Sequence, residues 1–219
     1  MYKRQVDIFA IVEQKLLEKG FKASGFAKRR REAENASRQV QFTKNHSFEV
    51  NLDDIYAQFL QQNSYSDACL KQAKEIEYAT ECSHLYAVPD LLALVTYLKG
   101  QHIPFCIVSD MYLPSAFLQQ VMQEKGFSGW DNFIVSCAVG KSKWGKDIWS
   151  LPYFQGRKIL HIGDNVQSDV VFPKGFGIET LHYARAMSKI PFDADLNAGC
   201  VNASENYRLQ EMKSRAKPE

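Results

Sequence analysis

The feature that most constrains the fold of this chain is an alternation of short apolar runs and helical segments between residues 103 and 182. Four runs rich in aliphatic and β-branched residues lie at 103–108, 133–135, 158–162 and 178–182. Helical segments separate them, and we expect one from Pro114 to Gly126 and another from Lys143 to about Leu151. Strands that alternate with helices predict βαβ units and a parallel sheet. We therefore expect an α/β fold with a doubly wound, Rossmann-like, mostly parallel sheet.

The first 88 residues carry a different, helical pattern. Apolar side chains recur at helix spacing in four segments, near residues 8–19, 26–40, 52–60 and 65–83. A fifth helix is expected from Pro89 to Gly100. We interpret the Arg29-Arg30-Arg31 triplet as part of a solvated helix face. The predicted organisation is a helical block over 1–88, an α/β core over 89–185 and a polar C-terminal tail over 186–219.

Composition and charge argue against several classes of protein. The 219 residues include 27 Lys+Arg and 25 Asp+Glu, and the net charge of +2 gives no reason to expect nucleic acid or an anionic membrane as partner. A nucleic-acid binder built on the arginine triplet is an alternative that this balance disfavours. The five cysteines form no CxxC pair, which argues against a zinc knuckle or a disulfide framework. No run approaches the roughly 18 apolar residues of a membrane span, so we expect a cytoplasmic protein.

Two of the predicted strands end beside residues suited to a phosphate group. Ser109 and Asp110 follow the first strand and precede a helix, where a hydroxyl and backbone N–H groups suit a phosphate oxygen. An ordinary helix cap is the alternative interpretation. Lys141, Lys143 and Lys146 follow the second strand, and a lysine there could neutralise a phosphoryl group.

The third predicted strand ends in a loop that carries two carboxylates. Gly163 allows a close turn of the backbone, Asn165 lies in the same loop, and Asp164 and Asp169 supply the carboxylates. Oxygen ligands of this kind suit Mg²⁺, which takes one or two carboxylates plus a substrate phosphate. We predict a magnesium site on this loop, with a polar turn as the alternative.

Together these segments resemble the haloacid dehalogenase-like (HAD) superfamily of hydrolases. Residues 107–114, with Ser109, resemble its motif II; Lys143 resembles its motif III; and residues 162–169 resemble its motif IV. The helical block resembles a cap-domain signature in Phe26-Ala27, Arg30, Ala33 and Glu34. The resemblance is to a subgroup found in bacterial surface-glycan and glycosyltransferase gene clusters.

The resemblance implies a Mg²⁺-dependent phosphatase that works through an aspartyl-phosphate. Ser109, Asp110 and Lys143 would bind phosphate, Asp164 and Asp169 would hold the metal, and Gly163 and Asn165 would complete the loop. The helical block would be the cap domain. The resemblance also implies a small phosphorylated substrate, such as a sugar phosphate, and association with a glycosyltransferase. We expect neither nucleic acid nor a membrane as partner.

The sequence departs from the family where motif I is expected. In family members the nucleophile lies in an Asp-x-Asp motif at the end of a strand that precedes the cap domain. In this sequence the first predicted element, which begins near Asp7, already resembles the first cap helix. Asp7 lacks a second carboxylate, Asp53-Asp54 reads as a helix cap, and Asp193-Ala194-Asp195 lies on the wrong side of motif IV. We therefore assign no catalytic nucleophile and expect this chain to be inactive without motif I.

Two explanations of this departure stay open. One is a hydrolase truncated at its N-terminus. The other is a natural, inactive HAD-like module that binds a phosphorylated ligand or supports a glycosyltransferase. In either form the missing strand, which is central in the family's sheet, would leave a gap between two strands.

Overall fold

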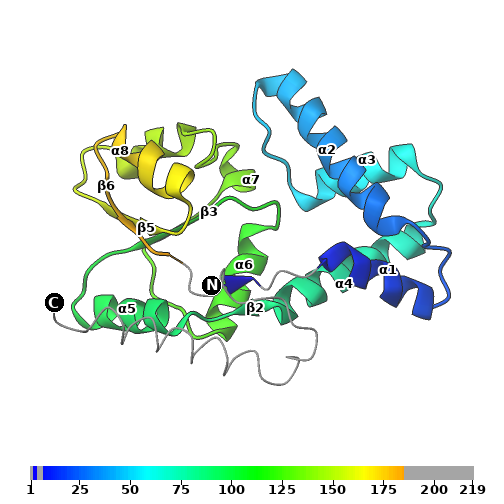
Figure 1. Ribbon diagram of the computed structural model, residues 1–219, viewed down its shortest axis with the longest axis horizontal. Helices are drawn as coiled ribbons and strands as arrows, with labels where there is room; N and C mark the ends of the chain where they lie inside the picture. The colour runs from blue at the N-terminus through cyan, green and yellow to red at the C-terminus, as the bar shows by residue number, and fades with distance from the viewer. Residues whose placement is uncertain (1, 4–6, 185–219) are drawn as a thin grey trace. The chain divides into compact units, whose positions relative to one another are not determined.

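The computed structural model describes residues 2–3, by their backbone, and 7–184 (Figure 1). The chain divides into two units, Met1–Ile148 and Trp149–Glu219, and each is described by itself. The polar tail expected over 186–219 and the Asp193-Ala194-Asp195 segment lie outside the described residues.

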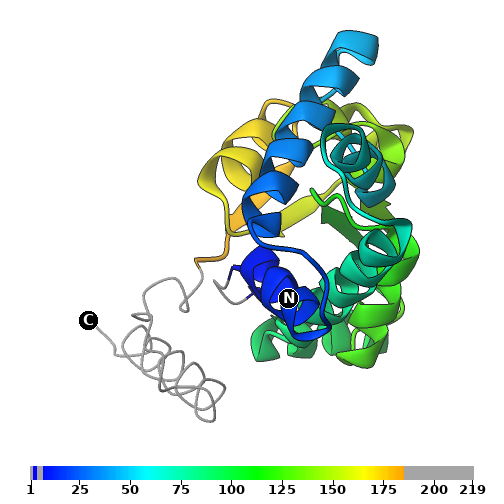
Figure 2. The same cartoon turned by 90° about the vertical axis from the view of Figure 1, so that its right-hand side faces the viewer.

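The first unit begins with the helices that the apolar spacing predicts. They are α1 (Ile8–Glu18), α2 (Phe26–Asn45), α3 (Leu52–Gln62) and α4 (Asp67–Ser83). Helix α1 packs on α4 and α2 packs on α3. In both ribbon views the C-terminal half of α2 extends away from α1 and α4 (Figures 1 and 2).

Side-chain caps explain where these helices begin. Asp7, Asn51 and Ser66 each accept a backbone N–H from the first turn of α1, α3 and α4. Asn51 also forms a capping box with Asp54. Helix α2 begins after Gly25, which is left-handed and offers no side chain, so the cap comes from α1: the Glu13 carboxylate accepts the N–H of Gly25 at 2.7 Å and that of Ala27 at 2.9 Å.

The core of the helices does not end at residue 88. Its buried residues include Leu16, Phe26 and Phe59 from the helices, and also Leu113 and Val135 from the expected α/β block. Burial of apolar surface therefore joins the two predicted regions within one unit. The boundary between the two units comes later in the chain, after Ile148.

The rest of the first unit contains one parallel strand pair and its helices. Its elements are β2 (Leu85–Tyr86), α5 (Pro89–Gly100), β3 (Cys106–Ser109), α6 (Ser115–Glu124), β4 (Asn132–Val135) and α7 (Ser136–Val139). Strand β3 is parallel to β4, with Ser109 opposite Val135 in the register. The short strand β1 (Tyr2–Lys3) pairs antiparallel with β2, which the sequence did not predict.

The second unit holds another parallel pair, β5 (Leu160–Gly163) and β6 (Glu179–His182). Between them lie a π-helical turn, Val166–Val171, and the short helix α8 (Phe172–Lys174). Trp149 is buried, and its ring lies 4.7 Å from that of His161 and 5.3 Å from that of Phe154. These three aromatic rings pack together beside β5.

The structure confirms a mixed α/β chain with parallel strand pairs, while the strands form three separate two-stranded sheets. Strands β3 and β5 each pair along one edge, and no described strand occupies the other edge of either. The single doubly wound sheet that we expected is therefore not seen among the described residues.

The helix expected from Lys143 to Leu151 is wrong. Residues 141–146 form a loop, followed by a short 3₁₀ helix at Asp147–Ser150. Side chains compete with the helical backbone here: Asp147 Oδ1 accepts the N–H of Ser142 at 3.0 Å, and Ser142 Oγ accepts that of Gly145 at 2.9 Å. Lys146 also adopts a left-handed φ of 67°, which an α-helix does not allow.

Candidate functional site

One candidate site, in the first unit, lies where β3 and β4 end. We call residues 109–113 the β3 loop and residues 140–146 the lysine loop. Ser109 is the last residue of β3 and is half-buried, and Asp110 is exposed. The carboxyl ends of parallel strands meet at one edge, which is where such folds bind ligands. The fold thus places Ser109 at the predicted position.

The Asp110 carboxylate joins the two loops. Its Oδ1 accepts the backbone N–H of Lys143 at 2.9 Å, and its Oδ2 accepts that of Trp144 at 3.2 Å. A carboxylate repels a phosphate, so these contacts suit Asp110 to positioning the lysine loop better than to direct phosphate binding. Lys143 is half-buried, and Lys146 is exposed. Ser109, Asp110 and Lys143 are therefore brought to the same part of the first unit.

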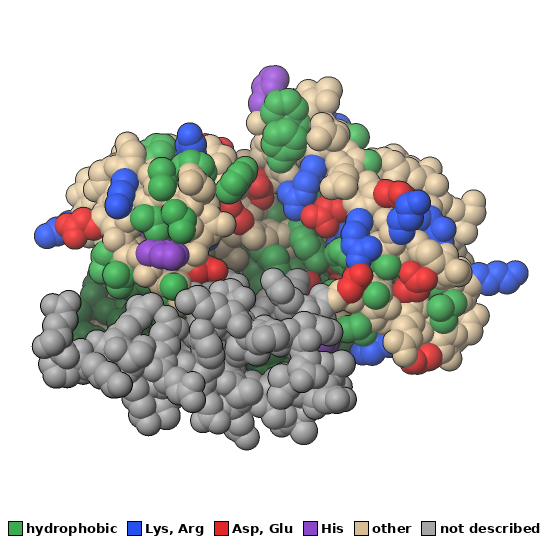
Figure 3. All heavy atoms as spheres, viewed as in Figure 1, with side chains coloured by type: hydrophobic (Ala, Val, Ile, Leu, Met, Phe, Trp, Pro, Cys, Tyr) green, Lys and Arg blue, Asp and Glu red, His purple; other side chains and the backbone are tan. Residues whose placement is uncertain are grey.

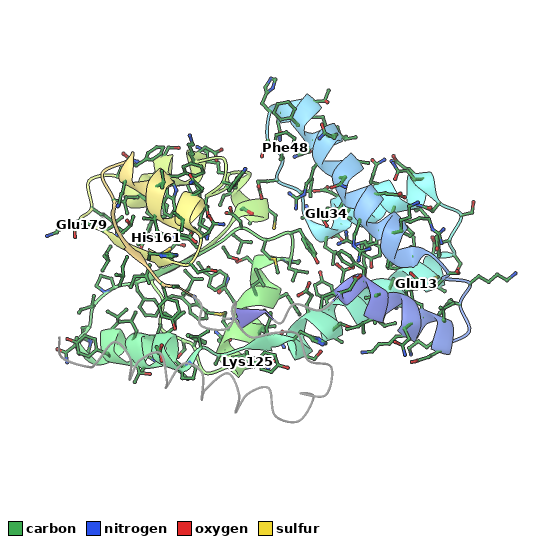
Figure 4. The ribbon with its side chains drawn as sticks, viewed as in Figure 1. Glu13, Glu34, Phe48, Lys125, His161 and Glu179 are labelled. Carbon is green, nitrogen blue, oxygen red and sulfur yellow. The ribbon has the colours of Figure 1, made fainter. Side chains whose placement is uncertain are left out.

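The helices reach the lysine loop through Ser47, which lies between α2 and α3. Its hydroxyl donates to the carbonyl of Gly140 at 2.9 Å. The neighbouring Phe48 is exposed and stacks on Phe42, with ring centroids 4.3 Å apart (Figure 4). The helical block thus contacts the segment that carries Lys143.

A second candidate site, in the second unit, lies at the end of β5. Asp169 is 2% exposed, and its Oδ1 lies 3.1 Å from His161 Nε2, a side chain labelled in Figure 4. Its Oδ2 accepts the backbone N–H of Asn165 at 3.0 Å. The Asn165 side chain in turn accepts the N–H groups of Gln167 and Ser168, both at 3.0 Å, and so caps the π-helical turn. Asp169 is thereby held rigidly beneath its own loop.

Gly163 allows this loop to fold closely. A Cβ atom at Gly163 would lie 2.4 Å from Cγ of Asp169, so any larger residue would force the loop to shift. Asp164, the next residue, is half-buried, and its carbonyl oxygen lies 3.1 Å from His182 Nε2. Gly163, Asp164, Asn165 and Asp169 therefore lie together, in the second unit.

The donors on this loop fit Mg²⁺ by type. Asp164 and Asp169 supply hard carboxylate oxygens, and Mg²⁺ commonly takes one or two such ligands and fills its other positions with waters and substrate oxygens. Within residues 7–184 no group of three or more His, Cys, Asp or Glu side chains gathers in a metal-binding arrangement. A cation here would therefore need water and phosphate oxygens to complete its coordination.

We considered three of the described carboxylates as substitutes for the motif I nucleophile. Asp7 caps α1 and pairs with Arg31, Asp54 closes the capping box of α3, and Asp53 pairs with Lys74 at 2.6 Å. All three lie at helix termini. Asp193 and Asp195 lie outside the described residues.

The burial of Arg30 was not predicted from the sequence. We expected this side chain on a solvated face, yet it is 0% exposed and pairs with the equally buried Glu77. Burial by itself lowers the pKa of Arg30, but the Glu77 carboxylate outweighs this and the pKa is raised. A signal was present in the spacing, because Arg30 lies on the same helix face as the buried Phe26, Ala33 and Ser37.

The charges at the surface of the helices are mixed. On the face of α1–α4 seen in Figure 3, Lys and Arg side chains lie among Asp and Glu side chains. None of the helices that the structure describes is long and apolar enough to cross a bilayer.

Comparison with known proteins identifies the fold. No family model matches the chain, and no curated protein matches it. Among solved structures it is similar to YfnB from Bacillus subtilis, described as a HAD-hydrolase and crystallised in an orthorhombic form bound to magnesium. The likeness covers 84% of each chain with a TM-score of 0.51 and 16% sequence identity. The chain therefore has a HAD-like fold.

Proposed function

We propose that this HAD-like chain is a phosphohydrolase component that binds a small phosphoester at Ser109 and Lys143, with Mg²⁺ at Asp164 and Asp169. The observation that carries the proposal is the double hydrogen bond from the lysine loop to Asp110. It fixes the segment bearing Lys143 beside the strand end bearing Ser109. A hydroxyl and an ammonium group suit the oxygens of a phosphoryl group, and these two residues carry one of each.

Each residue then has a separate task. The Ser109 hydroxyl donates to a phosphate oxygen, and the Lys143 ammonium group neutralises phosphate charge. Asp110 holds the two loops in register. On the other loop, His161 and the Asn165 N–H hold Asp169 in place, which leaves the more accessible Asp164 as the principal metal ligand. Mg²⁺, when bound, supplies further neutralisation of the phosphate.

The nucleophile is proposed from the resemblance alone. The family carries it on an Asp-x-Asp strand, and β3 has an edge that no described strand occupies. We propose that a strand of this kind completes the site in the active form. The alternative is a module that binds a phosphorylated ligand without turnover, which the engagement of Asp7 and Asp54 in helix caps favours for residues 7–184.

The substrate class and setting follow from the same resemblance. We propose a sugar phosphate as the first substrate to test and a glycosyltransferase as the first protein partner, in the cytoplasm. The helical block, which contacts the lysine loop through Ser47, would act as a cap that excludes water and selects the substrate.

The test is Mg²⁺-dependent phosphate release from a panel of phosphoesters that includes sugar phosphates. The 219-residue chain is assayed beside a form extended upstream through any in-frame Asp-x-Asp. Ser109→Ala removes the hydroxyl that is proposed to bind phosphate. Ser128→Ala is the matched control, because the Ser128 hydroxyl contacts Lys99, away from both loops. Binding of inorganic phosphate is measured in parallel.

Activity in the extended form alone, lost in Ser109→Ala and kept in Ser128→Ala, would support the hydrolase. Activity in the 219-residue chain would show that its nucleophile lies within this sequence, and Asp193 and Asp7 would be substituted next. Phosphate binding that depends on Ser109 without turnover in either form would support the binding module. Neither turnover nor Ser109-dependent binding would overturn the proposal.

A further inference from the structure

We infer that Tyr112 is a positioning residue for the phosphate site, because it ties the β3 loop to a buried charged network between α2 and α4. The inference rests on the proposed function for the role of Ser109 and Asp110. It goes beyond that function by assigning a task to buried residues that contact neither proposed ligand.

The network centres on Arg30 of α2. Its Nε and Nη2 atoms donate to the two carboxylate oxygens of Glu77 at 3.2 and 2.8 Å, and its Nη1 donates to Glu34 at 3.1 Å. The Tyr56 hydroxyl donates to Glu77 Oε2 at 2.9 Å. A planar guanidinium bound in this two-pronged way is fixed in direction as well as position. Helices α2, α3 and α4 are thereby joined at one buried point.

Tyr112 connects this network to the β3 loop. It is 9% exposed, its hydroxyl donates to Glu81 Oε1 at 3.2 Å, and its ring centroid lies 5.2 Å from Cζ of Arg30. Burial, and then the charges of Glu77 and Glu81, raise the pKa of the Tyr112 phenol, so the hydroxyl stays protonated and able to donate at neutral pH. Deprotonation of the phenol therefore does not break this contact at neutral pH.

The β3 loop is short enough for this contact to matter at Ser109. Asp110 is held by the lysine loop, and the N–H of Met111 donates to Ser136 Oγ at 3.0 Å. Tyr112 follows directly and is held from the other side by α4. Asp110, Met111 and Tyr112 thus each have an anchor, and the anchor of Tyr112 is the one that the helices supply.

The chain offers a matched control in Tyr56. Both tyrosines are buried, both donate to a buried glutamate of α4, and both rings lie near Arg30. They differ in where they sit, because Tyr56 belongs to α3 and Tyr112 to the β3 loop. Tyr112→Phe and Tyr56→Phe therefore make the same chemical change, the loss of one phenol hydroxyl. Only Tyr112→Phe makes this change in the β3 loop.

The experiment compares both variants by amide hydrogen exchange at Asp110 and Met111 and by the affinity for inorganic phosphate in the presence of Mg²⁺. Circular dichroism checks that each variant is folded. We expect Tyr112→Phe to speed exchange at both amides and to weaken phosphate binding by roughly tenfold, within the range of ordinary coupling between sites. Tyr56→Phe should lower the melting temperature and leave both loop measurements at the wild-type value.

Unchanged exchange in Tyr112→Phe, or equal changes in the two variants, would overturn the inference. The exchange measurement needs no ligand, so it decides the role of Tyr112 even in a protein that binds no phosphate. Absence of phosphate binding in the wild type would instead count against the proposed function. The two failures are therefore distinguishable.

Discussion

The buried pair of Arg30 and Glu77 gives the sharpest prediction about stability. Arg30→Met keeps much of the side-chain length and removes the charge. Glu77 would then be a carboxylate with 0% side-chain exposure, deprived of two of the hydrogen bonds that the structure shows. Because water cannot reach it, the lost interactions are not replaced by hydration.

Removing one partner of a buried ion pair costs about 3–5 kcal/mol in the free energy of unfolding. The guanidinium also lies 4.6 Å from the ring centroid of Phe9, a contact that adds about 0.5–2 kcal/mol when desolvated. We therefore expect a loss of about 3–5 kcal/mol or slightly more. For a chain of this size that corresponds to a fall in Tm of roughly 6–20 °C.

The assay is urea unfolding followed by circular dichroism at 222 nm. Arg31→Met is the matched control, since Arg31 has the same side chain on the next residue of α2 but is 46% exposed and pairs with a half-exposed Asp7. It should cost no more than about 1 kcal/mol. The double variant Arg30→Met/Glu77→Leu removes both charges and should cost less than Arg30→Met alone.

Two results would refute this reasoning. The first is an Arg30→Met variant that is no less stable than Arg31→Met. The second is a double variant whose loss equals the sum of the two single losses, because additive losses would show that the residues do not interact.

Three further predictions concern Gly163, Asp110 and Cys137. Gly163→Ala should destabilise the second unit by about 1–3 kcal/mol, seen in thermal unfolding followed by Trp149 fluorescence, because the new Cβ would meet Asp169. Asp110→Ala should speed amide exchange at Lys143, measured by NMR, because the acceptor for that N–H is lost. Cys137 should react with iodoacetamide about a hundredfold more slowly at pH 8 than an ordinary thiol, since burial, and then Glu49, raise its pKa from 9.0 to about 11.

Each of these predictions has a control. Gly100→Ala, where a Cβ meets nothing within 4 Å, should not destabilise the protein. Asp131→Asn alters a carboxylate that accepts the N–H of Phe105 and should leave exchange at Lys143 unchanged. Glu49→Gln should speed alkylation of Cys137, since it removes a charge that disfavours the thiolate. Alkylation should also rise with pH up to about 11, where the thiolate becomes the major form. A Cys137 thiol that is fully reactive at pH 8 would contradict the assigned burial.

The sequence predicted the helices well because local information defines them. The spacing of apolar residues acts within a few residues, and α3 and α4 begin close to where it places them. The strand ends at Ser109 and Gly163 were also predicted, since short buried strands bounded by polar residues are visible in the sequence.

The errors arose where a side-chain hydrogen bond or a distant contact overrides the pattern of residue types. The segment after Lys143 has a helical composition, but the hydrogen bond between Ser142 and Asp147 holds it as a loop. Arg30 looks solvated within a basic triplet, and only its partner Glu77, 47 positions away, explains its burial. Strand pairing is equally non-local, and no short-range signal shows which edges of β3 and β5 are occupied.

The shared core of the helices and the β3 loop also affects how the chain folds while it is being synthesised. Helices α1–α4 are complete at Ser83, but Leu113 and Val135, which cover part of their buried surface, are synthesised later. A ribosome adds about 5–20 residues per second, so the roughly 50 residues up to Val135 take about 3–10 seconds. During that interval the nascent helices expose apolar surface, and Arg30 and Glu77 lack the cover of Tyr112 until that residue is made. We therefore expect chaperone binding and proteolysis of the nascent chain to be greatest after its first four helices have been made.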